Sequence, residues 1–246
     1  MYTPIKTQST CATCWLEAVH SLLDGEKFNV ILDIDDPVNH TPEDHIAISK
    51  VDQFLKKYDK YPISTVANTI FPRSIYRRLG RPGLYQEYLK AFESLTKEKR
   101  WGRYFERMIR WEMDSGNILN PLEKIIEKLR HSVTSGPRYK SSYELTLYNP
   151  AKDSNLYRGG QCLSFISVKL DSDSKLMLTA MYRNHMYMER CLGNLIGLGW
   201  LMDFIAKEVG IEVGSLTVIS THAEIGDGKW GKRGVLQLLD SIKKSS

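Results

Sequence analysis

The sequence predicts an α+β fold in which a mainly antiparallel sheet packs around a central buried helix. Residues 189–208 are apolar nearly all round, which is typical of a helix without a solvent-facing side. Apolar positions alternate at 162–170 and at 175–182, and the turn residues 171–174 separate the two runs, as in a hairpin. A further strand is expected at 214–221, so strands and helix lie close together along the chain.

The first half of the chain is predicted to be mainly helical. Apolar spacing near 3.6 residues, with capping and stop signals, predicts helices at 13–24, 43–58, 83–95, 101–112 and 121–131. Short strands are expected at 30–32 and 143–148. The sequence contains no internal repeat and no linker-like stretch, so residues 1–246 are predicted to form a single domain.

Composition places the chain among ordinary globular proteins. It has 246 residues and a formal net charge of +5. No apolar run reaches the roughly 18–20 residues that span a bilayer, and residues 1–10 lack the apolar core of a signal peptide. We therefore expect a cytoplasmic protein without a membrane partner.

Two basic segments, 73–78 and 97–101, admit three interpretations. They are a nucleic-acid surface, a solvated helical face, or a site for one phosphate group. The last two are commoner for clusters this short, so nucleic acid is the less favoured partner.

Three of the four cysteines are predicted to be structural. Cys11 and Cys14 form a CxxC pair, but a zinc site needs four ligands and no second pair follows. A redox role for this pair is the weaker alternative. Cys191 begins the apolar helix and is expected in the core. The acidic run 33–36 before Pro37 is typical of a turn more than of a cation site, so no metal is predicted.

The fourth cysteine, Cys162, opens a strand and is a candidate nucleophile. Arg183 ends the next predicted strand, where a guanidinium would favour the thiolate and bind a phosphate group. Asn194 offers a donor and an acceptor, which suits the amide-like edge of a pyrimidine. Each residue also has a plain alternative: a core cysteine, a surface charge, and an asparagine that satisfies a backbone group.

Together these residues resemble the thymidylate synthase family, which includes the pyrimidine nucleotide hydroxymethylases. The likeness rests on the strand cysteine, on the spacing from Arg183 to Asn194 and on Leu192-Gly193 before that asparagine. The likeness covers residues 143–226. It is weaker at 101–131, where Trp101-Gly102-Arg103-Tyr104-Phe105 is similar to a Gly-x-x-Tyr-Gly segment of the family. Before residue 100 the chain is divergent and the likeness is slight. The resemblance implies a thymidylate synthase-like fold and a cysteine that adds to C6 of a pyrimidine nucleotide monophosphate.

The resemblance also assigns further site residues. Glu224 stands where the family has a histidine near the sugar hydroxyl, and His222 replaces an aspartate, so both are grouped with Cys162 as catalytic candidates. Asn184 joins Arg183 and Asn194 in the substrate-binding group. Arg138 and Lys140 are the nearest counterparts of the arginines that reach the phosphate from a partner chain.

Several departures bear on the activity that the family implies. Leu163 follows the cysteine where the family has histidine, and Met186 replaces an aspartate that helps to hold folate. The family implies methylenetetrahydrofolate as the one-carbon donor, and these departures argue against it. The resulting hypothesis is methylation or hydroxymethylation of a uracil-type nucleotide by a homodimer. The alternatives are a nucleotide-binding protein without turnover, and a nucleic-acid-binding module.

Overall fold

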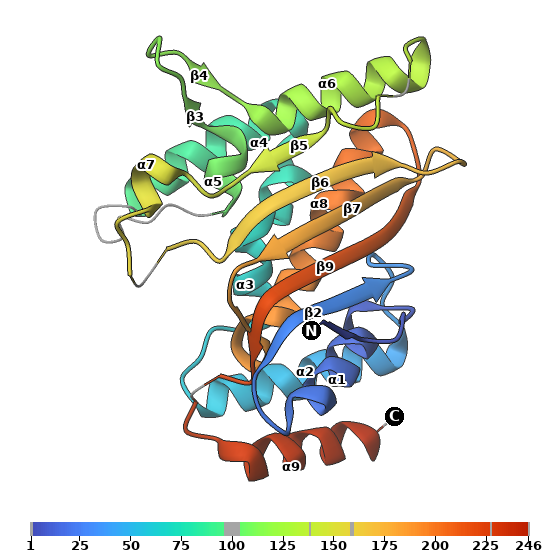
Figure 1. Ribbon diagram of the computed structural model, residues 1–246, viewed down its shortest axis with the longest axis vertical. Helices are drawn as coiled ribbons and strands as arrows, with labels where there is room; N and C mark the ends of the chain where they lie inside the picture. Colours follow the sequence, from blue (N-terminus) through green and yellow to red (C-terminus); the bar gives the residue numbers. More distant parts are fainter. Residues whose placement is uncertain (1, 96–103, 138, 158–159, 227, 246) are drawn as a thin grey trace.

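A mixed sheet runs through the middle of the molecule, with strands in the order β1-β2-β9-β7-β6-β5 and with β8 attached to β9 (Figure 1). The computed structural model describes residues 2–95, 104–137, 139–157, 160–226 and 228–245. The strands of this sheet are β1 (Thr3–Pro4), β2 (Lys27–Ile34), β5 (Glu144–Thr146), β6 (Leu163–Leu170), β7 (Leu176–Tyr182), β8 (His185–Met186) and β9 (Val213–Glu224). The predicted hairpin of β6 and β7 and the predicted last strand are confirmed.

The sheet is less antiparallel than predicted. β2 with β9, β6 with β7 and β5 with β6 pair antiparallel, as expected. The central pair, β7 with β9, is parallel, as are the short pairs of β1 with β2 and of β8 with β9. The cause is α8 (Leu192–Val209), which carries the chain across the sheet between β7 and β9, because parallel neighbours need such a crossover.

The helix α8 is buried on nearly all sides, as its apolar sequence predicted. α3 (Ile63–Ile70) crosses it closely: a methyl group on Gly197 would lie 2.7 Å from the carbonyl oxygen of Ala67. The predicted start at residue 189 differs from the structure, because Tyr187–Cys191 forms a π-helical turn before α8 begins. Such turns are frequent at functional sites.

The remaining helices are α1 (Cys11–Leu22), α2 (Pro42–Lys57), α4 (Arg73–Leu95), α5 (Tyr104–Ile109), α6 (Pro121–Thr134), α7 (Pro150–Asp153) and α9 (Gly231–Lys243). α4 consists of two helical parts that meet at a kink at Gly80, whose φ of 65° a helix does not allow. The part after the kink agrees with the helix predicted at 83–95, and the part before it was not predicted. The helix predicted at 101–112 is wrong beyond Ile109, because β3 (Trp111–Glu112) pairs with β4 (Ile118–Leu119) in a second, two-stranded sheet. Residues 101–103 lie outside the described residues.

One face of the main sheet packs on helices and the other is open. In Figure 1, α3 and α8 lie behind the sheet, and its near face is turned to the viewer. Along β7 the side chains alternate between buried Leu178 and Ala180 and outward-facing Met177 and Met181, each 37 % exposed. The open face therefore carries apolar side chains on its central strands.

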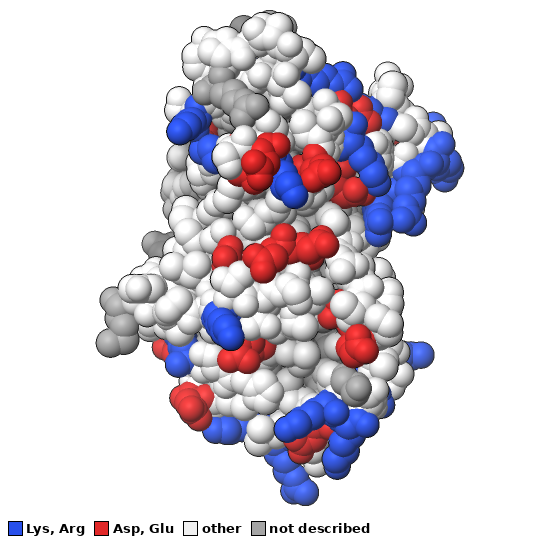
Figure 2. All heavy atoms as spheres, turned by 90° about the vertical axis from the view of Figure 1, so that its right-hand side faces the viewer, with Lys and Arg blue, Asp and Glu red and all other residues white. Residues whose placement is uncertain are grey.

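Charges of both signs are interspersed on the face shown in Figure 2. Lysines and arginines form larger groups near two ends of this face, and acidic side chains lie between them. On this face the mixture differs from the continuous basic surface expected of a nucleic-acid-binding module. Within the described ranges, no helix is both long and apolar enough to cross a lipid bilayer.

Candidate active site

Cys162 and Arg183 lie at neighbouring strand ends, as predicted. The carbonyl oxygen of Cys162 accepts a hydrogen bond of 2.9 Å from the backbone N–H of Arg183. Leu163 pairs with Tyr182 in the ladder of β6 and β7, so the two ends are held in register. The thiol is partly exposed. The structure therefore brings together a candidate nucleophile and a candidate phosphate ligand.

The guanidinium of Arg183 is positioned by the loop before Cys162. Its central carbon lies 5.8 Å from the centre of the Tyr148 ring, a cation–π contact. A methyl group on Gly160 would lie 2.2 Å from Nη2 of Arg183, so a side chain at this position would displace the guanidinium. Gly160 thus leaves room for the charge beside the thiol.

Two opposing effects act on the thiol of Cys162. Burial raises its pKa above the ordinary value, and the positive charges of Arg183 and Arg190 act in the other direction. Burial is the larger effect, so the thiol is mainly protonated at neutral pH. Arg190, on the π turn, was not predicted as a site residue.

Tyr104 of α5 is a second site residue that the sequence did not reveal. Its hydroxyl oxygen accepts a long hydrogen bond, 3.5 Å, from the backbone N–H of Leu163. Burial, assisted by the neighbouring Cys162, raises the pKa of Tyr104 to about 12, so its phenol stays protonated. Tyr104 belongs to the segment that resembles the family's Gly-x-x-Tyr-Gly pattern, but that pattern indicated no role for it.

A row of rings joins the thiol end of the site to Asn194. The rings of Tyr104 and Tyr182 meet edge to face, with 6.4 Å between their centres. Tyr182 stacks on His185 with 4.1 Å between ring centres. Nε2 of His185 lies 3.0 Å from Nδ2 of Asn194. The two ends of the predicted site are therefore connected through packed side chains.

Asn194 carries an unused hydrogen-bond acceptor. The residue is 3 % exposed, and its Oδ1 is shielded from solvent and has no partner among the described residues. Most buried polar atoms are hydrogen-bonded, because an unpaired one costs free energy. Since Nδ2 is engaged by His185, Oδ1 is the atom of this amide that has no partner among the described residues.

His185 fixes the orientation of the Asn194 amide. Burial lowers the pKa of His185 to about 3, so its ring is neutral and has one donor and one acceptor. Nδ1 lies 2.9 Å from Oγ of Ser220, which lies 3.1 Å from the hydroxyl of Tyr187. With Nδ1–H donating to Ser220, Nε2 accepts from Asn194. One histidine in a strand offers no sequence signal for this role.

Asn184, His222 and Glu224 form a separate chain of hydrogen bonds. Nδ2 of Asn184 donates to Oε1 of Glu224 at 3.3 Å. Nδ1 of His222 lies 2.7 Å from Oδ1 of Asn184, and its Nε2 lies 3.0 Å from Oε2 of Glu26. Three predicted residues are thus brought together, and Glu26, directly before β2, is a member that was not predicted. Asn184 follows Arg183 directly in the sequence, so this chain of hydrogen bonds begins next to the candidate phosphate ligand.

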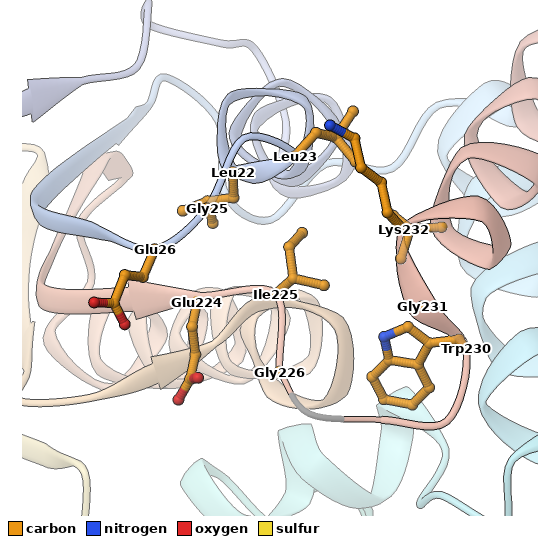
Figure 3. Close-up of a pocket in the computed structure, with 11 residues that line it drawn as sticks. Leu22, Leu23, Gly25, Glu26, Glu224, Ile225, Gly226, Trp230, Gly231 and Lys232 are labelled. Carbon is orange, nitrogen blue, oxygen red and sulfur yellow. The ribbon is translucent and has the colours of Figure 1, made fainter.

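A pocket of about 340 Å³ opens beside Glu26 and Glu224 (Figure 3). The indole nitrogen of Trp230 faces its interior in Figure 3, and this Nε1 is shielded from solvent and has no partner among the described residues. The ammonium of Lys232 turns away toward Asp24, to which it is joined at 3.3 Å. The pocket combines carboxylate acceptors with one N–H donor, a set suited to a ligand that carries hydroxyl groups.

The remaining predicted residues do not join this site. Lys140 is exposed in the loop after α6, and Arg138 lies outside the described residues, so their contact with a partner's nucleotide stays a prediction.

The other three cysteines are fully buried. Burial raises the pKa of Cys11 and Cys14, that of Cys14 to about 12, and the thiol of Cys11 donates to the carbonyl oxygen of Pro37 at 3.4 Å. Across the described ranges, no group of three or more His, Cys, Asp or Glu side chains comes together in a way that would hold a metal ion. The structure supports a structural role for the pair, and it confirms Cys191 as a core residue.

The chain is similar to curated archaeal proteins named "Putative thymidylate synthase". The protein of Methanosarcina mazei is 30 % identical over 127 residues, which cover 52 % of this chain and 54 % of that protein. The protein of Methanothermobacter thermautotrophicus is 38 % identical over 64 residues, or 26 % of this chain and 28 % of that protein. The protein of Methanocaldococcus jannaschii is 28 % identical over 170 residues, or 64 % of this chain and 73 % of that protein.

These alignments are partial. The chain spans about half the length of the first of these relatives. No family model matches the chain.

Proposed function

The chain is a divergent, thymidylate synthase-like relative of these archaeal proteins, and from that premise we propose that it transfers a one-carbon group to C5 of a pyrimidine nucleotide monophosphate. The observation that carries the proposal is the backbone hydrogen bond that holds Cys162 beside Arg183. A thiol and a guanidinium at neighbouring strand ends supply a nucleophile and a phosphate ligand for one small substrate.

The proposed reaction begins with attack of the Cys162 thiolate on C6 of the base. A sulfur–carbon bond forms, and the π electrons of the C5–C6 double bond move to C5 and O4 as an enolate. C5 then attacks an electrophilic one-carbon unit and afterwards loses its proton to water. Expulsion of the thiolate restores the double bond. Hydroxymethylation ends there, whereas methylation requires a further reduction of the one-carbon unit.

The base that fits Asn194 best is a uracil. Its N3–H donates to the unpaired Oδ1, and its O4 accepts the second hydrogen of Nδ2, because the first is directed to His185. A cytosine presents the opposite pattern at these two atoms. Since His185 fixes the amide, it acts as a positioning residue for base choice.

Arg190 has a distinct role in this proposal. A phosphate bound to Arg183 neutralises part of the charge that favours the thiolate. Arg190 is the other cation that lowers the pKa of Cys162, and it lies on a different element, the π turn. Arg190 therefore maintains the positive field on the thiol after the nucleotide has bound. Tyr104, whose phenol stays protonated, is a candidate proton donor beside Cys162.

The sugar is proposed to lie toward the chain formed by Asn184, His222 and Glu224. The carboxylate of Glu224 accepts hydrogen bonds from sugar hydroxyls, whereas the histidine of the family can also donate one. This arrangement accommodates a ribose as well as a deoxyribose.

The residue at position 186 does not fit methylenetetrahydrofolate. Met186 of β8 replaces the aspartate of the family, and its thioether is only a weak acceptor. The proposed reaction therefore has no step on folate, and its donor is an electrophilic one-carbon unit.

The proposed assembly is a homodimer that packs sheet against sheet. Its support is the open face of the main sheet, where Met177 and Met181 are exposed. In such a dimer, Lys140 and Arg138 are the residues proposed to reach the nucleotide of the partner chain.

One observation favours a second candidate function, a nucleotide-binding protein without turnover. Burial holds the pKa of Cys162 above its ordinary value despite two nearby arginines, so the apo protein contains little thiolate. Saturable nucleotide binding without release of tritium from C5 would select this alternative.

The binding part of the proposal is tested by calorimetric titration with dUMP, dCMP, UMP and CMP. We expect uracil nucleotides to bind more tightly, and Arg183→Ala to weaken binding by about tenfold or more, as loss of a charge-assisted hydrogen bond predicts. Arg233→Ala, which removes an exposed arginine of α9, is the matched control. Absence of binding by all four nucleotides would overturn both functions.

A further inference from the structure

The start of α4 and the middle of α8 form a second pocket, and we propose that it binds a small phosphorylated ligand independently of the thiol site. The pocket has a volume of about 510 Å³ and is lined by Asn68, Arg73, Ser74, Arg77, Arg78 and Trp200. None of the residues placed at the active site above lines it. The basic segment 73–78 therefore lines this pocket, and the second basic segment, 97–101, lies outside the described residues.

The charges in this pocket are unbalanced. Three arginines line it, and no carboxylate does. Arg73 and Arg77 are one helical turn apart, a spacing at which like charges repel. Arg73 is the first residue of α4, and the first turn of this helix contains no acidic residue. Burial, with the charge of Arg77 added, lowers the pKa of Arg73.

The guanidinium groups are available to a ligand. Among the described residues, no ion pair joins Arg73 or Arg77 to a carboxylate, and Arg78 has only a long, exposed contact of 3.6 Å with Glu87. Asp203, which acts on Arg73 at longer range, is paired with Lys207 at 2.7 Å.

The next arginine of α4 is different. Arg81 donates to both Glu123 and Glu208 and is thereby fully used within the fold. Unpaired charge is therefore a property of the pocket and not of the whole helix.

Trp200 organises the pocket from the side of α8. The guanidinium carbon of Arg73 lies 5.2 Å from the centre of its ring, which orients Arg73 by a cation–π contact. Nε1 of Trp200 is shielded from solvent and has no acceptor among the described residues. Most buried donors in proteins are hydrogen-bonded, so this indole N–H is a candidate donor to a bound ligand.

These features favour a compact polyanion over other ligands. Guanidinium groups bind phosphate oxygens in pairs. The volume lies within the range of small-molecule sites. Three positive charges suit a pyrophosphate group, whether free or as the end of a nucleotide.

The test is calorimetric titration with inorganic pyrophosphate in an Arg183→Ala background, which disables anion binding at the thiol site. We expect this protein to bind pyrophosphate, and Arg77→Ala in the same background to bind about tenfold more weakly or worse. The control, Arg233→Ala in that background, should change the affinity by less than about twofold, because exposed distant charges are screened. Failure of nucleotide binding at the thiol site would leave these expectations unchanged.

Thermal unfolding excludes misfolding as an explanation. Without pyrophosphate, Arg77→Ala should melt at the same or a higher temperature, because it relieves repulsion with Arg73. With pyrophosphate, proteins that retain Arg77 should gain more stability than the Arg77→Ala protein. Absence of binding in the Arg183→Ala protein, or an equal loss in the Arg233→Ala control, would overturn the proposal. Binding of a short oligothymidylate that depends on Arg77 and that pyrophosphate fails to displace would also overturn it.

Discussion

The backbone N–H of Arg183 donates to the carbonyl oxygen of Cys162 at 2.9 Å, at the point where the ladder between β6 and β7 ends. A single hydrogen bond of the sheet thus fixes a thiol and a guanidinium side by side. Because the contact is made by backbone atoms, either side chain can be changed without loss of the register. Each functional group can therefore be tested separately.

The ionisation of Cys162 should depend on both arginines. We expect Arg183→Ala and Arg190→Ala each to shift the pH midpoint of alkylation by iodoacetamide upward, because each removes a charge that lowers the pKa of the thiol. Arg183→Lys keeps the charge and should shift the midpoint less. Cys162→Ser gives the background, since Cys11, Cys14 and Cys191 are buried. Equal midpoints in all variants would refute the electrostatic role.

Gly160 should affect nucleotide binding only through the position of the Arg183 guanidinium. Gly160→Ala places a methyl group where Nη2 of Arg183 lies, so we expect nucleotide binding to weaken about as much as in Arg183→Ala. The measurement is a double-mutant cycle by calorimetry. In the Arg183→Ala background, Gly160→Ala should have no further effect, and a full additional loss there would contradict this contact.

His185 should make the stability of the fold depend on pH. Its pKa is about 3 in the folded protein against an ordinary value of 6.5, so between these values the unfolded chain binds one more proton. The free energy of unfolding should therefore fall with decreasing pH by up to about 1.4 kcal/mol per pH unit between these two values. The contribution of the neutral His185 ring to stability is complete only above pH 6.5.

Urea unfolding between pH 6 and pH 4 measures this slope. His185→Gln should make this slope smaller by the amount that corresponds to about one bound proton, relative to the unchanged protein. Ser220→Ala removes a hydrogen bond of the same ring but keeps the histidine, so it should lower the stability without removing the slope. An unchanged slope in His185→Gln would show that the ring is not held neutral.

Several of the site residues that the sequence predicted lie at the ends of neighbouring strands. Cys162 and Arg183 flank a hairpin, so alternation alone brings them together. Asn184, His222 and Glu224 were assigned to the site from the resemblance, and they meet because β8 pairs with β9, a contact that was not predicted.

The residues that were missed come from distant or irregular segments. The hydroxyl of Tyr104 contacts the backbone N–H of Leu163, next to Cys162, from a helix 59 positions earlier, and no local pattern encodes that contact. Arg190 depends on a π turn, whose extra residue shifts every following side chain around the helix. The parallel pairing of β7 with β9 was missed for a similar reason, because alternation predicts a strand but not its direction.

The most direct test of the central claim is release of tritium from C5 of the nucleotide that binds best. Addition of Cys162 to C6 makes C5 a carbon nucleophile that exchanges its proton with water. We predict release by the unchanged protein, loss of release in Cys162→Ser with binding retained, and slower release in Arg190→Ala at neutral pH. Release that persists in Cys162→Ser would contradict the proposed nucleophile, and binding without any release would assign the protein to nucleotide binding alone.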